Sequence, residues 1–204
     1  MNWNSIMNLR QTQRAKTRQI LIDTTWRIFA DQGISATRTA DVASAAGLSH
    51  GAVFAHFSTR EDLVVAAVEA YSIRFRTGLD ERLVLDFTVR GFLEAHLAQV
   101  AVDEALYSRI ASEGSLLPDA ARSAWLNVLT NLSLRLDEAV SRLPPSAQVR
   151  KLPLALVFNT WIGLLHHHLS YRDLYAPDGN LVARRGVALL DFMTALLDTE
   201  RMEP

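Results

Sequence analysis

The chain has 204 residues, of which 49% are hydrophobic and 21% charged, so it can bury the core of one large domain or two modest ones. This balance excludes a disordered tail. The sequence contains no cysteine, which excludes disulfides, thiolate metal sites and thiol catalysis.

The sequence also carries no obvious membrane signal. The most apolar stretch, Leu154 to Leu165, is too short to cross a bilayer and is interrupted by Asn159 and Thr160. The opening run MNWNSIMNLRQTQR lacks the charged, apolar and cleavage regions of a secretory signal. We therefore expect a cytoplasmic protein with no membrane partner.

A net charge of −1 hides an uneven distribution. Residues 1–60 hold seven Lys or Arg and three Asp, whereas the remaining 144 residues hold 14 basic and 19 acidic side chains. A basic amino-terminal part on an acidic remainder indicates that only the first part meets a polyanion. A solvated surface with no such partner is the alternative interpretation.

Helical patterns begin with the run TRQILIDTTWRIFADQG, which starts at Thr17 and stops at Gly33, a suitable left-handed cap. Its apolar stripe consists of Ile20, Leu21, Thr24, Ile28 and Phe29. Two short helices follow. Thr37 or Thr39 can cap the first, ADVASAA, and Ser49 can cap the second.

A longer fourth helix is predicted over residues 60–76, because Thr59 and Asp62 have the spacing of a capping box. No stretch shows sustained strand-like alternation. The predicted fold class is therefore all-α. We expect a three-helix helix-turn-helix domain over residues 14–60, joined by the fourth helix to a helical domain over residues 77–204.

The helix after Ser49 is short and carries small residues. Val53 and Phe57 share one face and can anchor it to the core, which leaves His50 and Gly51 on the other side. A DNA major groove admits such a helix, and its free amino-terminal amides favour phosphate. The alternative is an all-helical domain that contains a helix-turn-helix without binding DNA.

The run from Thr17 to Glu69 closely resembles the amino-terminal domain of the tetracycline-repressor (TetR) family of bacterial regulators. The residues that carry the resemblance are Ile20, Leu21, Phe29, Gly33, Thr37, Val42, Ala43, Ala46, Gly47, Ser49, Gly51, Phe54, His56, Phe57, Arg60, Glu61 and Leu63. The resemblance implies a homodimeric regulator, with a DNA-binding head and a helical body that binds a small effector or forms the dimer.

The same resemblance assigns roles in DNA binding. It implies phosphate contacts for Thr37, Thr39 and Arg60, and backbone or minor-groove tracking for a basic arm before the first helix. The full set comprises Thr37, Thr39, Ser49, His50, Gly51, Ala52, Phe54, His56, Arg60, Arg14, Lys16 and Arg18. Alternatives remain open: Thr37 as a cap only, His56 as a packing residue, and the arm as a solvated tail.

Two positions depart from the family pattern. His50 stands where lysine is common, and a largely neutral imidazole attracts phosphate less than a permanent charge does. Phe54 stands where tyrosine is common, so a hydroxyl that could reach phosphate is missing.

Beyond residue 77 the resemblance fades. Two helices are expected up to Gly114, broken near 101–103, followed by a long amphipathic helix that Pro144 ends. The run from Leu152 to Tyr175 is apolar nearly all round, which predicts cover on both sides, one of them by a second subunit. The predicted dimer interface comprises Trp161, Leu165, His168, Gly186, Leu189, Leu190, Met193 and Leu197.

Aromatic and histidine side chains of the second domain can line an effector pocket with a few polar groups. The candidates are Phe92, His96, Tyr107, Trp125, Trp161 and His166. Ordinary core or interface packing is the alternative for each. No charged cluster identifies a ligand, and no cofactor is expected.

Two other classes of function are open to such a chain. Three consecutive histidines, His166 to His168, suggest a metal-dependent enzyme. Consecutive helical residues point about 100° apart, however, and cannot converge on one ion without other ligands. We expect neither a metal site nor an enzyme. A helical interaction module that never binds DNA is the third class.

Overall fold

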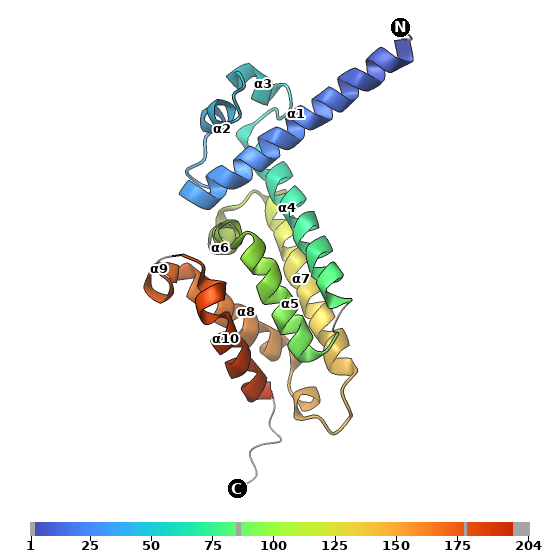
Figure 1. Ribbon diagram of the computed structural model, residues 1–204, viewed down its shortest axis with the longest axis vertical. Coiled ribbons are helices and arrows are strands. Elements are labelled where there is room, and N and C mark those ends of the chain that lie inside the picture. The colour runs from blue at the N-terminus through green and yellow to red at the C-terminus, as the bar shows by residue number, and fades with distance from the viewer. Residues whose placement is uncertain (1–2, 85–86, 178, 198–204) are drawn as a thin grey trace.

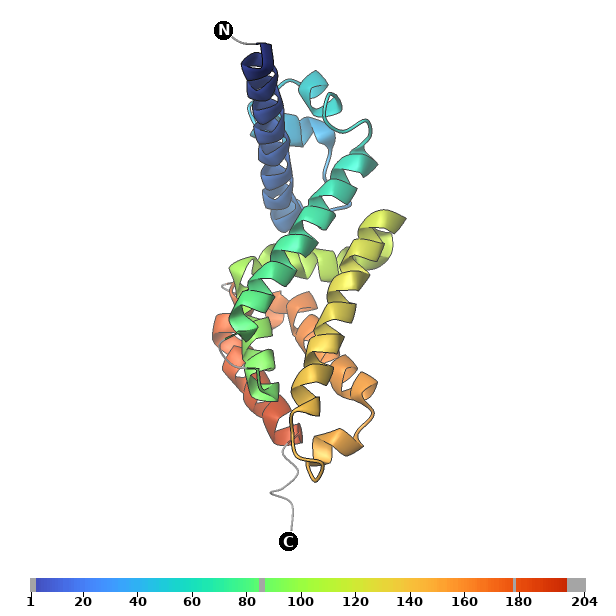
Figure 2. The ribbon, with the colours of Figure 1, turned by 90° about the vertical axis from the view of Figure 1, so that its right-hand side faces the viewer.

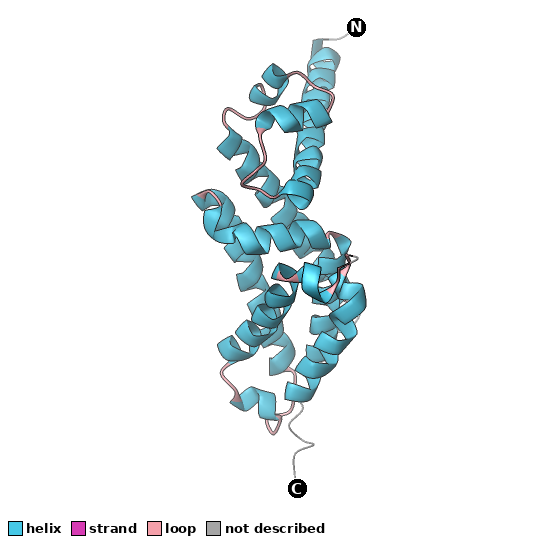
Figure 3. Ribbon diagram, turned by 90° about the vertical axis from the view of Figure 1, so that its left-hand side faces the viewer, coloured by secondary structure: helices cyan, strands magenta, loops and turns pink. Residues whose placement is uncertain are grey.

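The computed structural model describes residues 3–84, 87–177 and 179–197, and every regular element in these ranges is a helix (Figure 3). The α-helices are α1 Trp3–Gln32, α2 Thr39–Ala45, α3 His50–Phe54, α4 Arg60–Leu83, α5 Val89–Val102, α6 Glu104–Glu113, α7 Asp119–Ser141, α8 Leu154–Ser170, α9 Arg172–Tyr175 and α10 Leu181–Leu197. Short 3₁₀ turns cover Gly114–Leu116 and Gln148–Lys151. The predicted all-α class is confirmed.

The molecule has a small head and a larger body, joined by α4 (Figures 1 and 2). Helices α1, α2 and α3 form the head, and α5 to α10 with most of α4 form the body. The head has a core of its own, made of Leu21, Ile22, Val42, Ala43, Val53, Phe57, Leu63 and Ala66. Phe29 and Ile34, at the end of α1 and just after it, are instead buried with the body core.

Local capping signals place the helix starts of the head. The Ser49 side chain accepts a hydrogen bond from the amide of Ala52, and Thr59 and Asp62 form the complete capping box predicted for α4. Gly33 and Gly47 adopt positive φ of 91° and 66° where α1 and α2 end, which glycine tolerates without strain. These predictions are confirmed.

Two predicted helix bounds were too short. Helix α1 begins at Trp3 rather than near Thr17, so the basic arm is part of the helix and projects beyond the head (Figure 1). Helix α4 continues to Leu83 rather than ending at residue 76. Its later turns stay helical because they pack against the body, burying Leu79 and Leu83.

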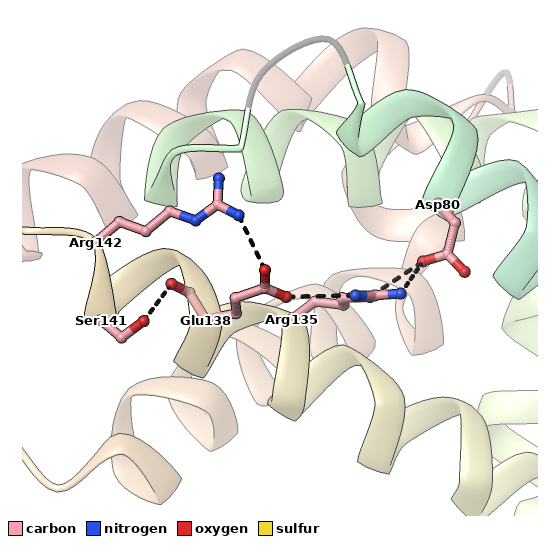
Figure 4. A network of polar contacts seen from close by, with 5 residues as sticks. All are labelled: Asp80, Arg135, Glu138, Ser141 and Arg142. Carbon is pink, nitrogen blue, oxygen red and sulfur yellow. Dashed lines mark hydrogen bonds and ion pairs between the residues drawn. The ribbon is translucent and has the colours of Figure 1, made fainter.

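Helix α4 runs beside α7 along the body, and polar contacts join them near the end of α4 farthest from the head (Figure 4). Arg135 donates to Asp80 and to Glu138, and Glu138 also accepts from Arg142. These side chains are between 34% and 55% exposed, so each ion pair contributes little.

The remaining body helices lie on the other side of α5. Helices α8 and α10 are neighbours, and α10 also packs on α5 (Figure 1). The helix is interrupted at Tyr171, so the predicted apolar run forms two helices, α8 and α9. Within the described residues no helix is both long and apolar enough to cross a membrane.

Candidate nucleic-acid interface

Helix α3 presents one face to solvent and buries the other. Val53 is fully buried in the head core, whereas His50, Gly51 and Phe54 are exposed and Ala52 is half-buried. A Cβ atom placed at Gly51 would meet nothing within 4 Å, so this face is free to approach a large partner closely. The short length and small residues of α3 thus produce an accessible helix surface.

The starts of α2 and α3 are joined at this surface. Thr39 Oγ1 lies 3.1 Å from Nε2 of His50, and the His50 ring lies 5.0 Å from the Phe54 ring. Both polar groups are at least partly accessible. They form one surface together with the amino terminus of α3, where unpaired amides favour an anion.

Two predicted phosphate-binding side chains are already occupied within the chain. Thr37 is only 3% exposed, and its hydroxyl donates to the carbonyl of Gly33 rather than capping α2. The N-cap residue of α2 is Arg38, without a side-chain cap bond. The Arg60 guanidinium donates to the carbonyls of Thr37 and Ile34, at 2.7 and 2.5 Å. Both side chains therefore have a structural role that the sequence does not reveal.

Three arginines follow one side of α1. Arg10, Arg14 and Arg18 are four residues apart, so they span about 80° of the helix circumference, with Lys16 far from them. Arg14 donates to the carbonyl of Ala55 at the end of α3, and the Arg18 guanidinium lies 5.1 Å from the Phe57 ring. The stripe therefore borders α3. No acidic residue precedes Asp23 in the sequence.

His56 lies at the same border and is partly buried. Burial lowers the pKa of His56, and the charges of Arg14 and Arg18 lower it further. The imidazole is therefore held in its neutral form beside the arginine stripe.

The six predicted effector residues form one cluster in the body. Phe92, His96, Tyr107 and Trp161 are fully buried, and Trp125 is 4% exposed. Neighbouring ring centroids lie 5.3 to 6.2 Å apart. Whether these side chains bind an effector stays a prediction.

Hydrogen bonds order the polar members of the cluster. Trp161 Nε1, which can only donate, donates to Nδ1 of His96 at 2.8 Å, so the proton of neutral His96 is on Nε2. That nitrogen faces the Tyr107 hydroxyl at 3.4 Å, and the hydroxyl lies 2.9 Å from Nε2 of His166. Each group therefore donates a hydrogen bond to the next in the order Trp161, His96, Tyr107, His166. We call this series of four hydrogen-bonded side chains the polar chain.

Burial keeps the polar chain uncharged. Burial lowers the pKa of His96 to about 3, with a smaller contribution from His166, and it lowers the pKa of His166 to about 4. It also raises the pKa of Tyr107. The cluster therefore offers neutral hydrogen-bonding groups among aromatic walls.

The predicted dimer residues are mostly buried inside the single chain. Trp161, Leu165 and Met193 are 0% exposed, so they cannot provide the surface that the prediction requires. Gly186, Leu189 and Leu190 are also buried, and His168 and Leu197 are half-buried. The apolar pattern of the sequence predicted the two helices α8 and α10, but it did not predict which side of each helix faces the body.

The opposite faces of α8 and α10 carry the exposed apolar side chains. On α8, Leu156 is 63% exposed. On α10, Val187, Phe192 and Leu196 are 70%, 57% and 47% exposed. Gly163 of α8 is also exposed, and a side chain there would meet nothing within 4 Å. Phe192 and Leu196 are four residues apart and share one side of α10, whereas Val187 lies half a turn round the helix from Leu196. We call Leu156, Gly163, Phe192 and Leu196 the α8–α10 face.

The three consecutive histidines diverge, as helix geometry predicts. His166 contacts Tyr107 inside the body, His167 Nε2 lies 3.2 Å from the Tyr175 hydroxyl, and His168 Nδ1 lies 2.8 Å from the carbonyl of Leu164. In the described part of the chain no three His, Cys, Asp or Glu side chains are grouped to hold a metal ion.

Two residues of the site escape prediction from the sequence. Arg10 is a third arginine at four-residue spacing, which is a usable signal once α1 is known to extend that far. Glu113, at the end of α6, accepts hydrogen bonds from the turn between α1 and α2. No sequence signal identifies that contact, because 78 residues separate Glu113 from Ser35.

Comparison with known proteins adds to this geometry. The family model "Bacterial regulatory proteins, tetR family" matches residues 21–67, which cover the end of α1, α2, α3 and the start of α4. The regulator AcrR of Shigella flexneri is 42% identical over 48 residues, 24% of this chain and 22% of that protein. The transcriptional repressor KstR2 of Rhodococcus jostii is 29% identical over 125 residues, 53% of this chain and 61% of that protein.

The chain thus spans less than two thirds of these curated relatives. Over a greater length, its fold matches PfmR, a TetR-family regulator from Thermus thermophilus, with a TM-score of 0.69 at 19% identity, covering 90% of this chain and 99% of that one. The matched proteins are transcriptional regulators rather than enzymes. The predicted resemblance is confirmed: residues 21–67 match the model of the TetR family, and the fold of the chain is similar to that of a solved TetR-family regulator.

Proposed function

We propose that the protein is a cytoplasmic, dimeric transcriptional repressor that binds a palindromic DNA operator and is released by a small effector. The exposed face of α3 beside the arginine stripe of α1 carries this proposal. It combines a helix free to enter a major groove with charges placed to meet the flanking phosphates. We propose repression rather than activation because KstR2 is named a transcriptional repressor.

In this proposal, base edges are read by His50, Gly51 and Ala52, while Thr39 and the arginine stripe contact phosphate. Phe54 offers apolar contact rather than a hydroxyl. Arg60 and Thr37 support the interface from within the head and do not touch DNA. Lys16 lies off the stripe and contributes only general attraction.

A dimer would form through the α8–α10 face. Three large apolar side chains there, Leu156, Phe192 and Leu196, are about half exposed or more, which is costly to leave in water. Their helices lie at the edge of the body, across α5 from α4 (Figure 1). Two heads about 34 Å apart would then meet successive major-groove faces of one site.

The effector would bind at the polar chain. Neutral imidazoles and a tyrosine hydroxyl among aromatic rings suit a largely apolar molecule with a hydrogen-bonding group. Such a molecule releases DNA if it binds better to a body conformation that holds the heads at another spacing.

The test is binding to duplexes selected from a random pool, measured over a range of salt concentrations. We expect saturable dimer binding to a palindrome, with log K falling linearly with log salt. His50→Ala should relax base preference at one position per half-site. Arg10→Gln, which removes one phosphate contact per subunit, should reduce the salt slope of the dimer by about 2.

Lys16→Gln is the matched control for the arginine stripe, because it removes the same charge from another side of α1. Its salt slope should stay closer to that of the unchanged protein than the slope of Arg10→Gln does. Equal slopes for the two variants would refute the stripe as a phosphate contact. Sequence-blind binding by the unchanged protein would refute the operator itself.

The dimer has a separate test. Phe192→Glu places a charge on the α8–α10 face, where an interface would have to desolvate it, so sedimentation should change from dimer to monomer. Asp191→Lys, at the adjacent exposed residue, is the control for a charge change on α10. If Phe192→Glu stays dimeric, the dimer interface does not lie on the α8–α10 face.

A further inference from the structure

We infer that Glu113, the last residue of α6, is a positioning residue that sets the orientation of the DNA-binding head relative to the body. Its carboxylate holds the turn of residues 33–37, which joins α1 to α2. For its effect on DNA, this inference rests on the proposed function. The contacts that carry it are independent of that proposal.

Both oxygens of the Glu113 carboxylate bind the turn. Oε1 accepts from the amide of Ile34 at 3.1 Å, and Oε2 accepts from the amide and the hydroxyl of Ser35, both at 2.8 Å. Hydrogen bonds to a charged acceptor are stronger than neutral ones. One body side chain therefore satisfies two backbone donors of the head.

Gly33 makes this approach possible. A Cβ at Gly33 would lie 2.6 Å from Oε1 of Glu113, and the residue has a φ of 91°. Any other side chain would push the carboxylate away and strain the backbone. The glycine that ends α1 thus also opens the turn to α6.

The turn is held from α4 as well. Arg60 donates to the carbonyls of Ile34 and Thr37, while the Ile34 side chain is buried in the body core. Arg109 of α6 donates to the carbonyl of Asp31. We call the turn with Glu113 and Arg60 the clasp. Within residues 33–37, Glu113 of α6 holds two backbone amides, and Arg60 of α4 holds two backbone carbonyls.

The clasp lies between the polar chain and the DNA-binding face. Tyr107 is on the same helix as Glu113, about 9 Å earlier along its axis. On the other side, Thr39 begins α2 two residues after the turn and contacts His50 of α3. A displacement of α6 at Tyr107 would therefore reach α2 and α3 through the Glu113 carboxylate, beside the contact of Arg109 with Asp31. A cavity of about 200 Å³ adjoins Glu113 and Ser35, so the carboxylate has space to leave the turn.

The experiment compares Glu113→Gln and Glu113→Ala with the unchanged protein. Glu81→Gln is the matched control, since Glu81 is an exposed carboxylate of α4 away from the turn. Two quantities are measured without effector: amide hydrogen exchange at Ile34 and Ser35, and affinity for the selected operator. Thermal unfolding reports whether the body stays folded.

We expect exchange at both amides to be roughly tenfold faster in Glu113→Ala, and less accelerated in Glu113→Gln, which keeps one acceptor oxygen. Operator affinity should fall about fivefold to thirtyfold in Glu113→Ala, because the head must then be oriented on binding. Glu81→Gln should change neither quantity.

A Ser35→Ala change sharpens the result, since it removes only the hydroxyl bond. Its effect on affinity should be smaller, and should largely vanish when Glu113 is already Ala. Unchanged exchange at Ile34 and Ser35 would overturn the clasp whether or not the protein binds DNA. Faster exchange with unchanged operator affinity would leave a structural contact and overturn the positioning role.

Discussion

The head and the body use polar side chains in opposite ways. In the head, His50 and Thr39 pair at an accessible surface, around a core of few side chains. In the body, His96 and Tyr107 pair in the deepest part of a much larger core. The difference indicates that the head is built to present polar groups to a partner, whereas the body is built to enclose them.

The largest expected effect tests the body core. Phe75 is fully buried and its ring contacts both His96 and Tyr107. Phe75→Ala should lower the free energy of unfolding by about 3–5 kcal/mol, through lost burial and the cavity left behind. Urea unfolding measures it. A loss below about 1 kcal/mol would mean that the body is not the rigid half of the molecule.

The polar chain predicts a pH dependence of nearly the same size. His96 and His166 have pKa values lowered to about 3 and about 4, against about 6.5 in the unfolded chain. At these two histidines, only the unfolded state takes up protons as the pH falls from 6.5 toward the folded pKa values. Stability is therefore full above that pH, and each histidine removes roughly 1.4 kcal/mol per pH unit until its own folded pKa is reached.

Urea unfolding between pH 7 and pH 5 measures this slope. His166→Gln removes one of the two groups, so its curve should be flatter than that of the unchanged protein. His50→Gln, in the exposed head, is the comparison variant. Equal slopes for all three proteins would show that the buried imidazoles do not govern the pH response.

A smaller effect is expected in the head core. Val53→Ala removes two methyl groups from a fully buried site and should cost about 1–3 kcal/mol. Because few other side chains hold α3, the loss should appear mainly as faster hydrogen exchange in α2 and α3 and weaker operator binding, with the body transition unchanged. A single transition destabilised throughout would show that head and body unfold together.

The smallest effect is expected at the exposed ion pairs of Figure 4. Glu138→Gln weakens the contacts of Arg135 and Arg142, yet these groups are in water and salt screens them. We expect a change of about 0–1 kcal/mol in urea unfolding and none in operator binding. A larger loss would indicate that this end of α4 carries strain from the head.

Local chemistry decides which parts of the fold the sequence could predict. The Ser49 cap and the Thr59–Asp62 capping box involve residues three apart, and both are present. The start of α1 was missed because the residues before Thr17 lack apolar periodicity. The end of α4 was missed because distant helices bury its last turns.

In the candidate DNA-binding site too, only features that depend on local spacing could be predicted from the sequence. Exposure of His50 and Gly51 follows from their spacing against Val53, so it was predictable. The engagement of Arg60 with Ile34 and Thr37 depends on how the chain folds back over more than twenty residues, and no local pattern reports it. For α8 and α10, an apolar pattern on most sides gives no indication of which half faces the body.

Helix α4 has a mechanical consequence. Its 24 residues form one uninterrupted rod about 36 Å long, with its first residue in the clasp and its last turns packed in the body. A rod of that length amplifies small angles. A tilt of about 5° at the far end would carry Arg60 and the head about 3 Å sideways. In a dimer the two displacements would add, and the distance between recognition helices would change by more than the rise of one base pair.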